Sequence, residues 1–404
     1  MRALSGTDSA RGAESLPHRD VEASEEDATL DQPDTTLFPS VPLVDLALQH
    51  TLVSETIEQG WAQVIETSSF VLGGDVGRFE RAFASFCGVR HCIGTASGTD
   101  ALELSLRALG VGQGDEVIVP TNSFIASASA VVRAGGIPVL VDVDPACLLI
   151  DPEQVAARRT RRTAAVIAVH LFGQMAPVEE VRRSVDDRVF LVEDAAQAHG
   201  ATRHGVVAGG FGEAAATSFY PGKNLGAYGD AGGVLTGDDE VATKVRALRD
   251  HGSRVKYHHP EIGFNSRLDT LQAVVLNAKL PHLDSWNQAR REAAERYDKL
   301  LGDIQSVVRP QVLDGNEHVW HLYVVRVPRR DEVLSGLRAA GVGAAVHYPT
   351  PIHLQGAFRH LGCREGDFPV AEAASREILS LPIYPGITPE QQDRVINELR
   401  RILG

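Results

Sequence analysis

The sequence predicts an α/β protein with one large domain built on a sheet and a smaller α+β domain after it. Two observations predict this class. From Val41 onward, short apolar runs alternate with helical patterns, and near Pro281 a long helical stretch leads out of that alternation. With 404 residues and 43% hydrophobic content, the chain is long enough for two such domains, at 41–282 and 283–404.

Seven short apolar runs are predicted to be the strands of the large domain. They lie at residues 91–94, 116–120, 137–143, 164–169, 189–193, 214–220 and 232–236. Helical patterns lie between them. Leu102, Leu106 and Leu109 share one face of a predicted helix at 99–109, and a second helix is predicted at 123–133. This alternation is typical of a sheet layered between helices.

The smaller domain is predicted from a different order of elements. It begins with a helix at 283–301, followed by a strand at 321–327, a helix at 330–340, a short strand near 345–347 and helices at 369–379 and 389–403.

The net charge of −14 is unevenly distributed. Residues 1–40 hold nine acidic side chains and three arginines, a net of −6, with few aromatics and no periodic apolar face. Such a stretch is typical of a disordered tail, and its charge argues against nucleic-acid binding. No apolar run is long enough for a membrane span and no signal peptide is recognisable, so we expect a cytoplasmic protein.

Lys223 is the strongest candidate for a reactive group. Only five of the 39 basic residues are lysines, at 223, 244, 256, 279 and 299. Lys244, Lys279 and Lys299 lie in amphipathic runs and are expected on helix surfaces. Lys256 and Lys223 lack such a setting. Lys223 follows a predicted strand through a Pro-Gly turn, so its amine is expected to project from the sheet edge. A phosphate-binding loop is excluded because Thr217 and Asn224 break the G-x-x-x-x-G-K-[ST] pattern.

Asp194 supplies the second half of a recognisable chemistry. It closes the predicted strand at 189–193, at the carboxyl end where ligands of open α/β sheets bind. A carboxylate there can keep a pyridine nitrogen protonated while Lys223 forms an imine, which together are the minimal apparatus for pyridoxal phosphate chemistry. Small residues follow, and Gln197 is placed to reach the phenolic oxygen of such a ring. The alternative is that Glu193 and Asp194 are ordinary turn residues.

Candidates for holding the rest of the cofactor come from two further segments. Ser97-Gly98-Thr99 lies between a strand and a helix, where free amides and the positive helix end would meet a phosphate. A plain capped turn is the alternative. Ser218 would add a hydroxyl to the same phosphate. Phe124 is a candidate to stack on the ring, although an isolated aromatic more often lies in a core.

The chain from about Val41 to its end resembles the sugar aminotransferases of the DegT/DnrJ/EryC1/StrS family. This family is a branch of the fold-type I, aspartate aminotransferase-like pyridoxal phosphate enzymes. The motifs that carry the resemblance are SGTDAL at 97–102, GDEVI at 114–118, EDAAQ at 193–197, SFYPGKN at 218–224 and GFNSR at 263–267. The resemblance implies a large domain with a mixed seven-stranded sheet.

The resemblance also implies a role for each matching residue. Lys223 is the imine-forming lysine, Asp194 the partner of the pyridine nitrogen, Gln197 the oxygen contact, Phe124 the stacking residue, and Gly98, Thr99 and Ser218 the phosphate ligands. Asn265 matches an asparagine that reaches the phosphate in the neighbouring subunit, which implies a homodimer with shared active sites. Deoxysugar dehydratases of the family have histidine in place of this lysine.

The implied activity is transfer of an amino group from L-glutamate to a dTDP-linked 3-oxo-6-deoxyhexose in deoxyaminosugar and antibiotic biosynthesis. A dTDP-4-oxo-sugar aminotransferase and a non-catalytic regulatory protein with the same fold are the alternatives. Candidate substrate contacts are Tyr220, Arg267, His347 and His353. The two histidines lack a cysteine or carboxylate at a usual ligand spacing, so we expect a loop that contacts sugar or diphosphate and no metal site.

Overall fold

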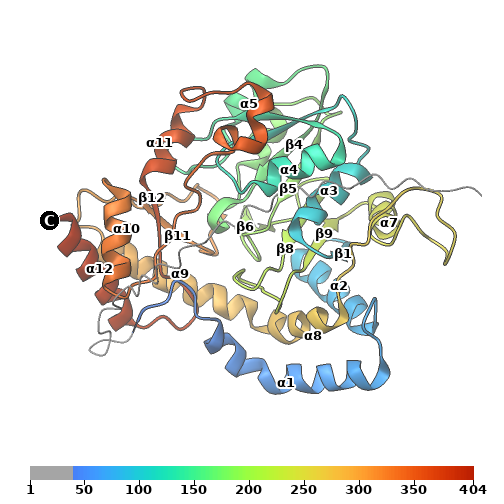
Figure 1. The fold of residues 1–404 in the computed structure, drawn as a ribbon, viewed down its shortest axis with the longest axis horizontal. Coiled ribbons are helices and arrows are strands. Elements are labelled where there is room, and N and C mark those ends of the chain that lie inside the picture. Colours follow the sequence, from blue (N-terminus) through green and yellow to red (C-terminus); the bar gives the residue numbers. More distant parts are fainter. Residues whose placement is uncertain (1–39) are drawn as a thin grey trace, which may run out of the picture. The chain divides into compact units, whose positions relative to one another are not determined.

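A seven-stranded mixed sheet lies at the centre of the computed structural model, which describes residues 40–404 (Figure 1). Across the sheet the order is β1 (His91–Thr95), β9 (Gly232–Thr236), β8 (Ala214–Ser218), β5 (Phe190–Asp194), β4 (Thr163–Val169), β2 (Glu116–Pro120) and β3 (Ile137–Val141). Only β9 runs against its neighbours in this sheet. The predicted α/β class and its seven strands are confirmed.

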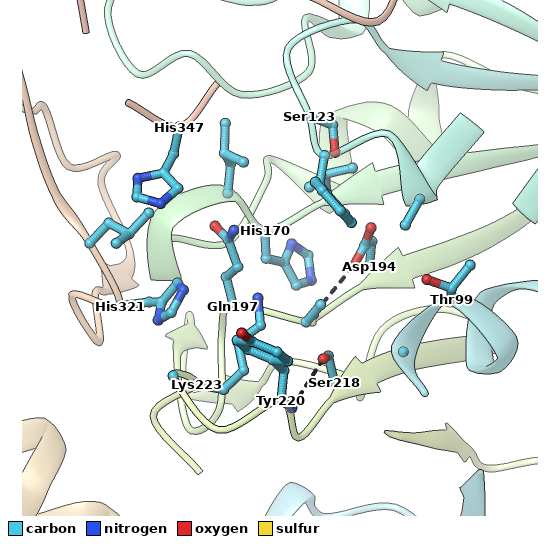
Figure 2. A pocket seen from close by; sticks show the side chains of 18 of the residues that line it. Thr99, Ser123, His170, Asp194, Gln197, Ser218, Tyr220, Lys223, His321 and His347 are labelled. Carbon is cyan, nitrogen blue, oxygen red and sulfur yellow. Dashed lines mark hydrogen bonds between the residues drawn. The ribbon is translucent and has the colours of Figure 1, made fainter. Parts of the chain in front are cut away.

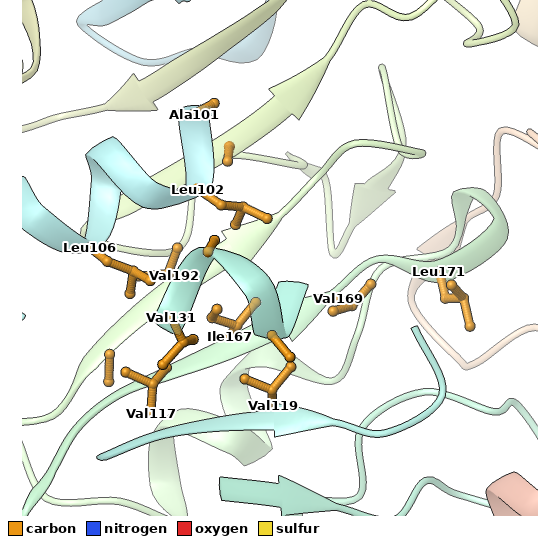
Figure 3. Close-up of a cluster of buried hydrophobic side chains, with 14 of the residues drawn as sticks. Ala101, Leu102, Leu106, Val117, Val119, Val131, Ile167, Val169, Leu171 and Val192 are labelled. Atoms are coloured by element: carbon orange, nitrogen blue, oxygen red, sulfur yellow. The ribbon is translucent and has the colours of Figure 1, made fainter. Parts of the chain in front are cut away.

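Helices cover both faces of the sheet, because side chains alternate along each strand. Val117 and Val119 of β2 belong to a buried apolar cluster with helices α3 (Gly98–Ala108) and α4 (Ala126–Ala134), drawn in Figure 3. Ile118 between them packs in another cluster with α5 (Pro152–Arg158) and α6 (Val178–Arg183). The core therefore occupies two layers.

The remaining helices of this part flank the β1 end of the sheet. They are α1 (Leu46–Thr67), α2 (Gly74–Cys87), α7 (Asp239–Leu248) and α8 (Thr270–Lys279). Phe79 and Phe83 of α2 pack with Phe219 and with Leu276 of α8. The sequence reasoning did not identify α1 and α2 as helices. Several apolar side chains of α1 are exposed, among them Leu48 and Leu52.

The C-terminal part forms a second apolar cluster around a two-stranded sheet. Its elements are α9 (Leu283–Leu300), β11 (Tyr323–Arg326), α10 (Arg330–Ala339), α11 (Pro369–Glu377), β12 (Ile378–Leu381) and α12 (Pro389–Leu403). Strands β11 and β12 pair antiparallel, and α10 lies against α12. Short elements complete the fold: β6 (Thr202–Arg203), β7 (Val206–Val207), β10 (Asn316–Glu317) and 3-10 turns at Leu171–Gly173, Leu280–His282, Ile352–Leu354 and Gly356–Leu361.

Two predictions for the C-terminal part need correction. The helix expected at 369–379 forms but ends at Glu377, because Ile378–Leu381 pairs with β11. A four-residue apolar run carries too little periodicity to separate helix from strand. The short strand expected near 345–347 is reduced to one bridge between Ala345 and Ser380.

Domain limits are only partly described by the structure. The predicted tail at 1–40 lies, except for Ser40, outside the described residues. Residues 40–404 form one compact unit, and α9 begins at the predicted boundary residue 283. The division at 282 stays a prediction. None of the helices in the described part of the chain is long and apolar enough to cross a membrane.

Strand direction determines where functional side chains meet. Strands β8, β5, β4 and β2 are parallel, so the segments that follow them emerge at one edge of the sheet. Strand β1 points the same way, because β9 is antiparallel to both β1 and β8. This carboxyl edge is where open α/β sheets bind ligands.

Candidate active site

A cavity of about 480 Å³ lies at this carboxyl edge. Of the residues named from the sequence, Gly98, Thr99, Phe124, Asp194, Gln197, Ser218, Tyr220, Lys223 and His347 line it. In Figure 2 Thr99 lies on one side of the cavity and His321 and His347 on the other, with Lys223 and Asp194 between them. The N-terminus of α3 also borders this cavity, because Ser97, Gly98 and Thr99 line it. Ser97 caps the helix by accepting a hydrogen bond from Asp100 N–H at 3.1 Å.

Lys223 carries the only lysine amine that lines this cavity. The turn after β8 places it there, with its backbone N–H donating to Tyr220 O at 2.9 Å. Burial lowers the pKa of Lys223 to about 8, although the Asp194 carboxylate acts in the opposite direction. A neutral, nucleophilic amine is therefore accessible near physiological pH.

Asp194 lies at the last position of β5 and is almost fully buried. Its Oδ2 accepts a hydrogen bond from Ser127 Oγ at 2.8 Å, and its Oδ1 accepts from Ala196 N–H at 3.3 Å. Burial raises the pKa of Asp194, and these donors together with Lys223 and His170 limit the rise. The carboxylate is thus suited to a cationic partner in the cavity.

Glu193, the neighbour of Asp194, has a structural role. Its carboxylate accepts from His170 Nε2 at 2.8 Å and from the backbone N–H groups of Gly209, Phe211 and Gly212. Burial pushes the pKa of Glu193 upward, but the His170 hydrogen bond and the backbone donors outweigh it, so the pKa falls. Because strand side chains alternate, one carboxylate supports the loop and the other faces the cavity.

Gln197 is held in one orientation by its surroundings. Its Oε1 accepts from Phe172 N–H at 2.6 Å, so its Nε2 is the end that remains to donate. That nitrogen donates to the Tyr348 hydroxyl at 3.1 Å. Tyr348 also lies against Phe124, with ring centroids 5.4 Å apart. Sequence reasoning missed Tyr348, although it adjoins the predicted contact His347.

The N-terminus of α3 approaches the ends of β8 and β9 very closely. A Cβ on Gly98 would lie 2.6 Å from Ser218 Cβ, and one on Gly232 would lie 2.3 Å from the Ser97 carbonyl carbon. Glycine at both positions lets the first-turn amides of α3 and the Ser218 hydroxyl share one corner of the cavity. First-turn amides lack intrahelical acceptors, so this corner suits a phosphate group.

Two histidines form the opposite wall. His347 is partly buried and its Nδ1 bonds to Ser380 Oγ at 2.8 Å. Burial, and secondarily the charge of Lys223, lowers the pKa of His347 to about 4. His321 is buried beside Asn224, and burial lowers its pKa well below the usual range. Both rings are therefore neutral near physiological pH.

Three predicted site residues do not line this cavity. Asn265 is exposed and bridges to Asp250 through its backbone, and Arg267 pairs with the Asp250 carboxylate at 2.9 Å. His353, the third, is buried, and both of its ring nitrogens have partners in the protein. Its Nδ1 bonds to Thr121 Oγ1 and its Nε2 to the Glu372 carboxylate, so its role as a substrate contact stays a prediction that this position does not support.

Lys279 also differs from its expected place on a helix surface. It is 2% exposed, its Nζ donates to Gly226 O at 2.8 Å, and it lies 4.3 Å from the centre of the Tyr228 ring. Burial lowers the pKa of Lys279 to about 8. The amphipathic pattern failed here because α8 packs between α1 and α2 and has little free surface.

Known proteins resemble this chain over most of its length. A sequence model of the DegT/DnrJ/EryC1/StrS aminotransferase family matches residues 52–400. The erythromycin biosynthesis sensory transduction protein EryC1 of Saccharopolyspora erythraea is 45% identical over 361 residues, 89% of this chain and 99% of its own. The dTDP-3-amino-3,4,6-trideoxy-alpha-D-glucose transaminase of Streptomyces venezuelae is 44% identical over 363 residues, 90% of this chain and 96% of its own.

Solved structures agree in fold. DesV of S. venezuelae, solved in complex with a ketimine intermediate, has a TM-score of 0.88 and 43% identity, covering 90% of this chain and 98% of its own. NtdA of Bacillus subtilis with bound cofactor PMP has a TM-score of 0.83 and 31% identity, covering 91% of this chain and 86% of its own.

Proposed function

Because this chain belongs to the DegT/DnrJ/EryC1/StrS aminotransferase family, we propose that it transfers an amino group from L-glutamate to a dTDP-linked 3-oxo-6-deoxyhexose. The observation that carries this proposal is the meeting of Lys223 and Asp194 in one cavity beside the N-terminus of α3. The S. venezuelae relative, named as a dTDP-3-amino-sugar transaminase, supports the choice of substrate and of the 3-position.

The residues that line the cavity fit pyridoxal 5′-phosphate. Gly98, Thr99 and Ser218 would hold its phosphate, and the Gln197 amide would donate to its phenolic oxygen. Asp194 would accept from the protonated ring nitrogen, and Phe124 would cover one face of the ring. NtdA, which shares the fold, was solved with PMP. When bound, the cofactor supplies an electron sink that makes the α-hydrogen of the amino donor acidic.

Lys223 would do the proton transfers of both half-reactions. Its lowered pKa would allow the neutral amine to accept the α-proton of glutamate and the resulting ammonium group to donate it again. Over both half-reactions the amino group of glutamate is exchanged for the oxo group of the sugar, which gives 2-oxoglutarate and the amino sugar. In the second half the sugar carbonyl receives the nitrogen, and Lys223 delivers a proton to the sugar carbon. Asp194 stays ionised throughout and balances the ring cation.

The charges of the substrates support a homodimer with shared sites. Glutamate carries two carboxylates and the sugar a diphosphate, yet no arginine lines the described cavity. Arg267 and Asn265 lie outside the cavity of their own subunit. We propose that Asn265 of one subunit reaches the phosphate site of the other and that Arg267 contacts substrate there. Exposed Leu48 and Leu52 on α1 support burial of a surface by a second copy.

Two alternatives can be separated from this proposal. The first is amination at the 4-position. The second is a non-catalytic regulatory role, because the relative EryC1 is named a sensory transduction protein. A regulator would not need Lys223 and Asp194 in one cavity, which favours the enzyme.

A cytoplasmic location stays a prediction.

The test is an assay with L-glutamate and, separately, 3-oxo and 4-oxo dTDP-6-deoxyhexoses, followed by mass spectrometry of the products. The proposal expects replacement of oxygen by an amino group in the 3-oxo sugar and formation of 2-oxoglutarate. Turnover of the 4-oxo sugar alone would move the reaction to the other carbon. Loss of a ring hydroxyl without nitrogen transfer would indicate a dehydratase. Absence of any reaction with glutamate would favour the regulator.

A further inference from the structure

Two buried serines, one just before α4 and one inside it, are linked to Asp194 by hydrogen bonds. Ser127 is fully buried, and its Oγ lies 2.8 Å from Asp194 Oδ2. Ser123 is 4% exposed and lines the cavity, and its Oγ lies 2.7 Å from Ser127 Oγ. The two hydroxyls and the carboxylate therefore form a continuous chain, in which Ser127 is the middle member.

The direction of hydrogen bonding in this chain follows from the number of protons. An ionised carboxylate only accepts, and a serine hydroxyl has one proton to donate. The Ser127 proton therefore goes to Asp194, and Ser123 must donate to Ser127. Hydrogen bonds that point the same way polarise one another, so Ser123 strengthens the bond that Ser127 makes to the carboxylate.

Ser127 makes the shorter of the two hydrogen bonds that the carboxylate receives. The Ala196 N–H is 3.3 Å from Oδ1, compared with 2.8 Å for the Ser127 hydroxyl and Oδ2. The titratable side chains that act on Asp194 are Lys223 and His170, and the Nε2 of His170 bonds to Glu193 instead. A neutral donor at 2.8 Å is thus the main contact that keeps a buried carboxylate ionised and fixes its rotation.

The same segment carries Phe124, one of the aromatic side chains that line the cavity. The Ser127 N–H donates to Phe124 O at 3.2 Å, which fixes the turn that carries Phe124. A serine inside a helix commonly bonds to the carbonyl one turn before it. Ser127 bonds to the Ser123 side chain and to Asp194 instead, so its hydroxyl serves a group outside its helix.

We propose that Ser127, assisted by Ser123, is a positioning residue that holds Asp194 as an oriented anion against the ring nitrogen of the cofactor. This inference rests on the proposed function. It predicts that the Ser127 hydroxyl contributes to cofactor binding through the ring nitrogen and through no other cofactor atom.

Cofactor binding to the cofactor-free full-length protein tests this. Dissociation constants are measured by fluorescence for pyridoxal 5′-phosphate and for its analogue in which carbon replaces the ring nitrogen. Wild type should prefer the natural cofactor. Ser127→Ala should reduce that preference about tenfold, the effect of losing one hydrogen bond to a charged group. Ser123→Ala should reduce it by a smaller factor, and Ser127→Thr, which keeps a hydroxyl, should restore part of it.

Ser129→Ala is the matched control, since Ser129 is a partly buried serine of the same helix. It should leave the preference unchanged. An unchanged preference in Ser127→Ala would overturn the inference, because a purely structural serine would weaken both ligands equally. If Ser127→Ala does not fold, an unchanged preference in Ser123→Ala overturns it. If wild type binds neither compound, the proposed function itself fails.

Discussion

At Lys223, the burial that makes the amine reactive also opposes folding of the cofactor-free chain. Burial lowers its pKa from the ordinary 10.5 to about 8, so the folded state holds its proton less tightly than the unfolded state. Between those two pH values the unfolded chain binds more protons, and stability rises with pH. Below about pH 8 the full cost of burying the amine is present. Such a conflict between stability and reactivity is common at active sites.

Replacing this amine should therefore stabilise the cofactor-free protein. Lys223→Met is expected to raise the free energy of unfolding at pH 7 by up to about 3 kcal/mol, measured by urea denaturation. The gain should shrink as the pH approaches 10. Lys299→Met, at an exposed helix position, is the control and should change little. A less stable Lys223→Met protein at pH 7, or a gain independent of pH, would contradict the account.

Glu193 offers the opposite dependence on pH. Glu193→Gln places an amide NH₂ against backbone N–H donors. We therefore expect the free energy of unfolding at pH 7, measured by urea denaturation, to fall by about 3 kcal/mol. The lowered pKa means that Glu193 stabilises the fold above its ordinary pKa of 4.5, and that this is lost as the pH falls through the folded value. The difference from wild type should thus narrow in acid. Glu240→Gln, at an exposed position, should show no such trend.

The residues that could be predicted in the cavity are charged side chains at the ends of apolar strands, where such side chains are unusual. Lys223 follows a strand and Asp194 closes one, and both line the cavity. Ser127 and Tyr348 gave no such signal, because a serine in a helix and a tyrosine in a loop are ordinary. His353 lies away from the cavity, and the sequence does not show that Thr121 and Glu372 occupy its ring nitrogens.

At the scale of elements, the phosphate corner depends on how closely α3 approaches the sheet. Gly232 of β9 has no room for a side chain, since a Cβ there would lie 2.3 Å from the Ser97 backbone. Backbone atoms cannot move aside as a flexible side chain can, so any added carbon displaces the start of α3. Elements with strong periodicity, such as α9 and α12, were predicted closely, whereas short apolar runs such as β12 were not.

Gly232→Ala should therefore destabilise the protein and loosen its phosphate corner. We expect a loss of about 2–4 kcal/mol in the free energy of unfolding and weaker binding of pyridoxal 5′-phosphate. Gly237→Ala is the matched control at the other end of the strand, where a Cβ would meet open space, and it should be within about 1 kcal/mol of wild type. Equal free energies of unfolding for the two variants would contradict this prediction, because they would show that the start of α3 can shift without loss of stability.

At the scale of the whole molecule, the described part of one chain supplies its cavity with Lys223, with the Asp194 carboxylate and with the corner that suits a phosphate. It supplies no arginine to bind anionic substrates there. Asn265 and Arg267 lie outside their own cavity, which is the arrangement that shared sites require. The sheet and its carboxyl edge followed from alternating strands and helices in the sequence. The order of the strands did not, because pairing between distant segments leaves no local pattern.

Mixing two inactive variants tests the shared site. In a heterodimer of Lys223→Ala and Asn265→Ala chains, one of the two sites contains both wild-type residues. Random mixing of equal amounts should thus restore about a quarter of the wild-type activity, while each variant alone stays low. Activity that does not recover on mixing, with heterodimers verified by mass spectrometry, would mean that both residues act within one subunit.

The most direct test of the central claim is chemical trapping of the cofactor. The protein is incubated with pyridoxal 5′-phosphate, reduced with borohydride, digested and mapped by mass spectrometry. The account predicts one labelled peptide, with the label at Lys223, and loss of that label when glutamate is added before reduction. A label at Lys279 or Lys256, or no label at all, would contradict it.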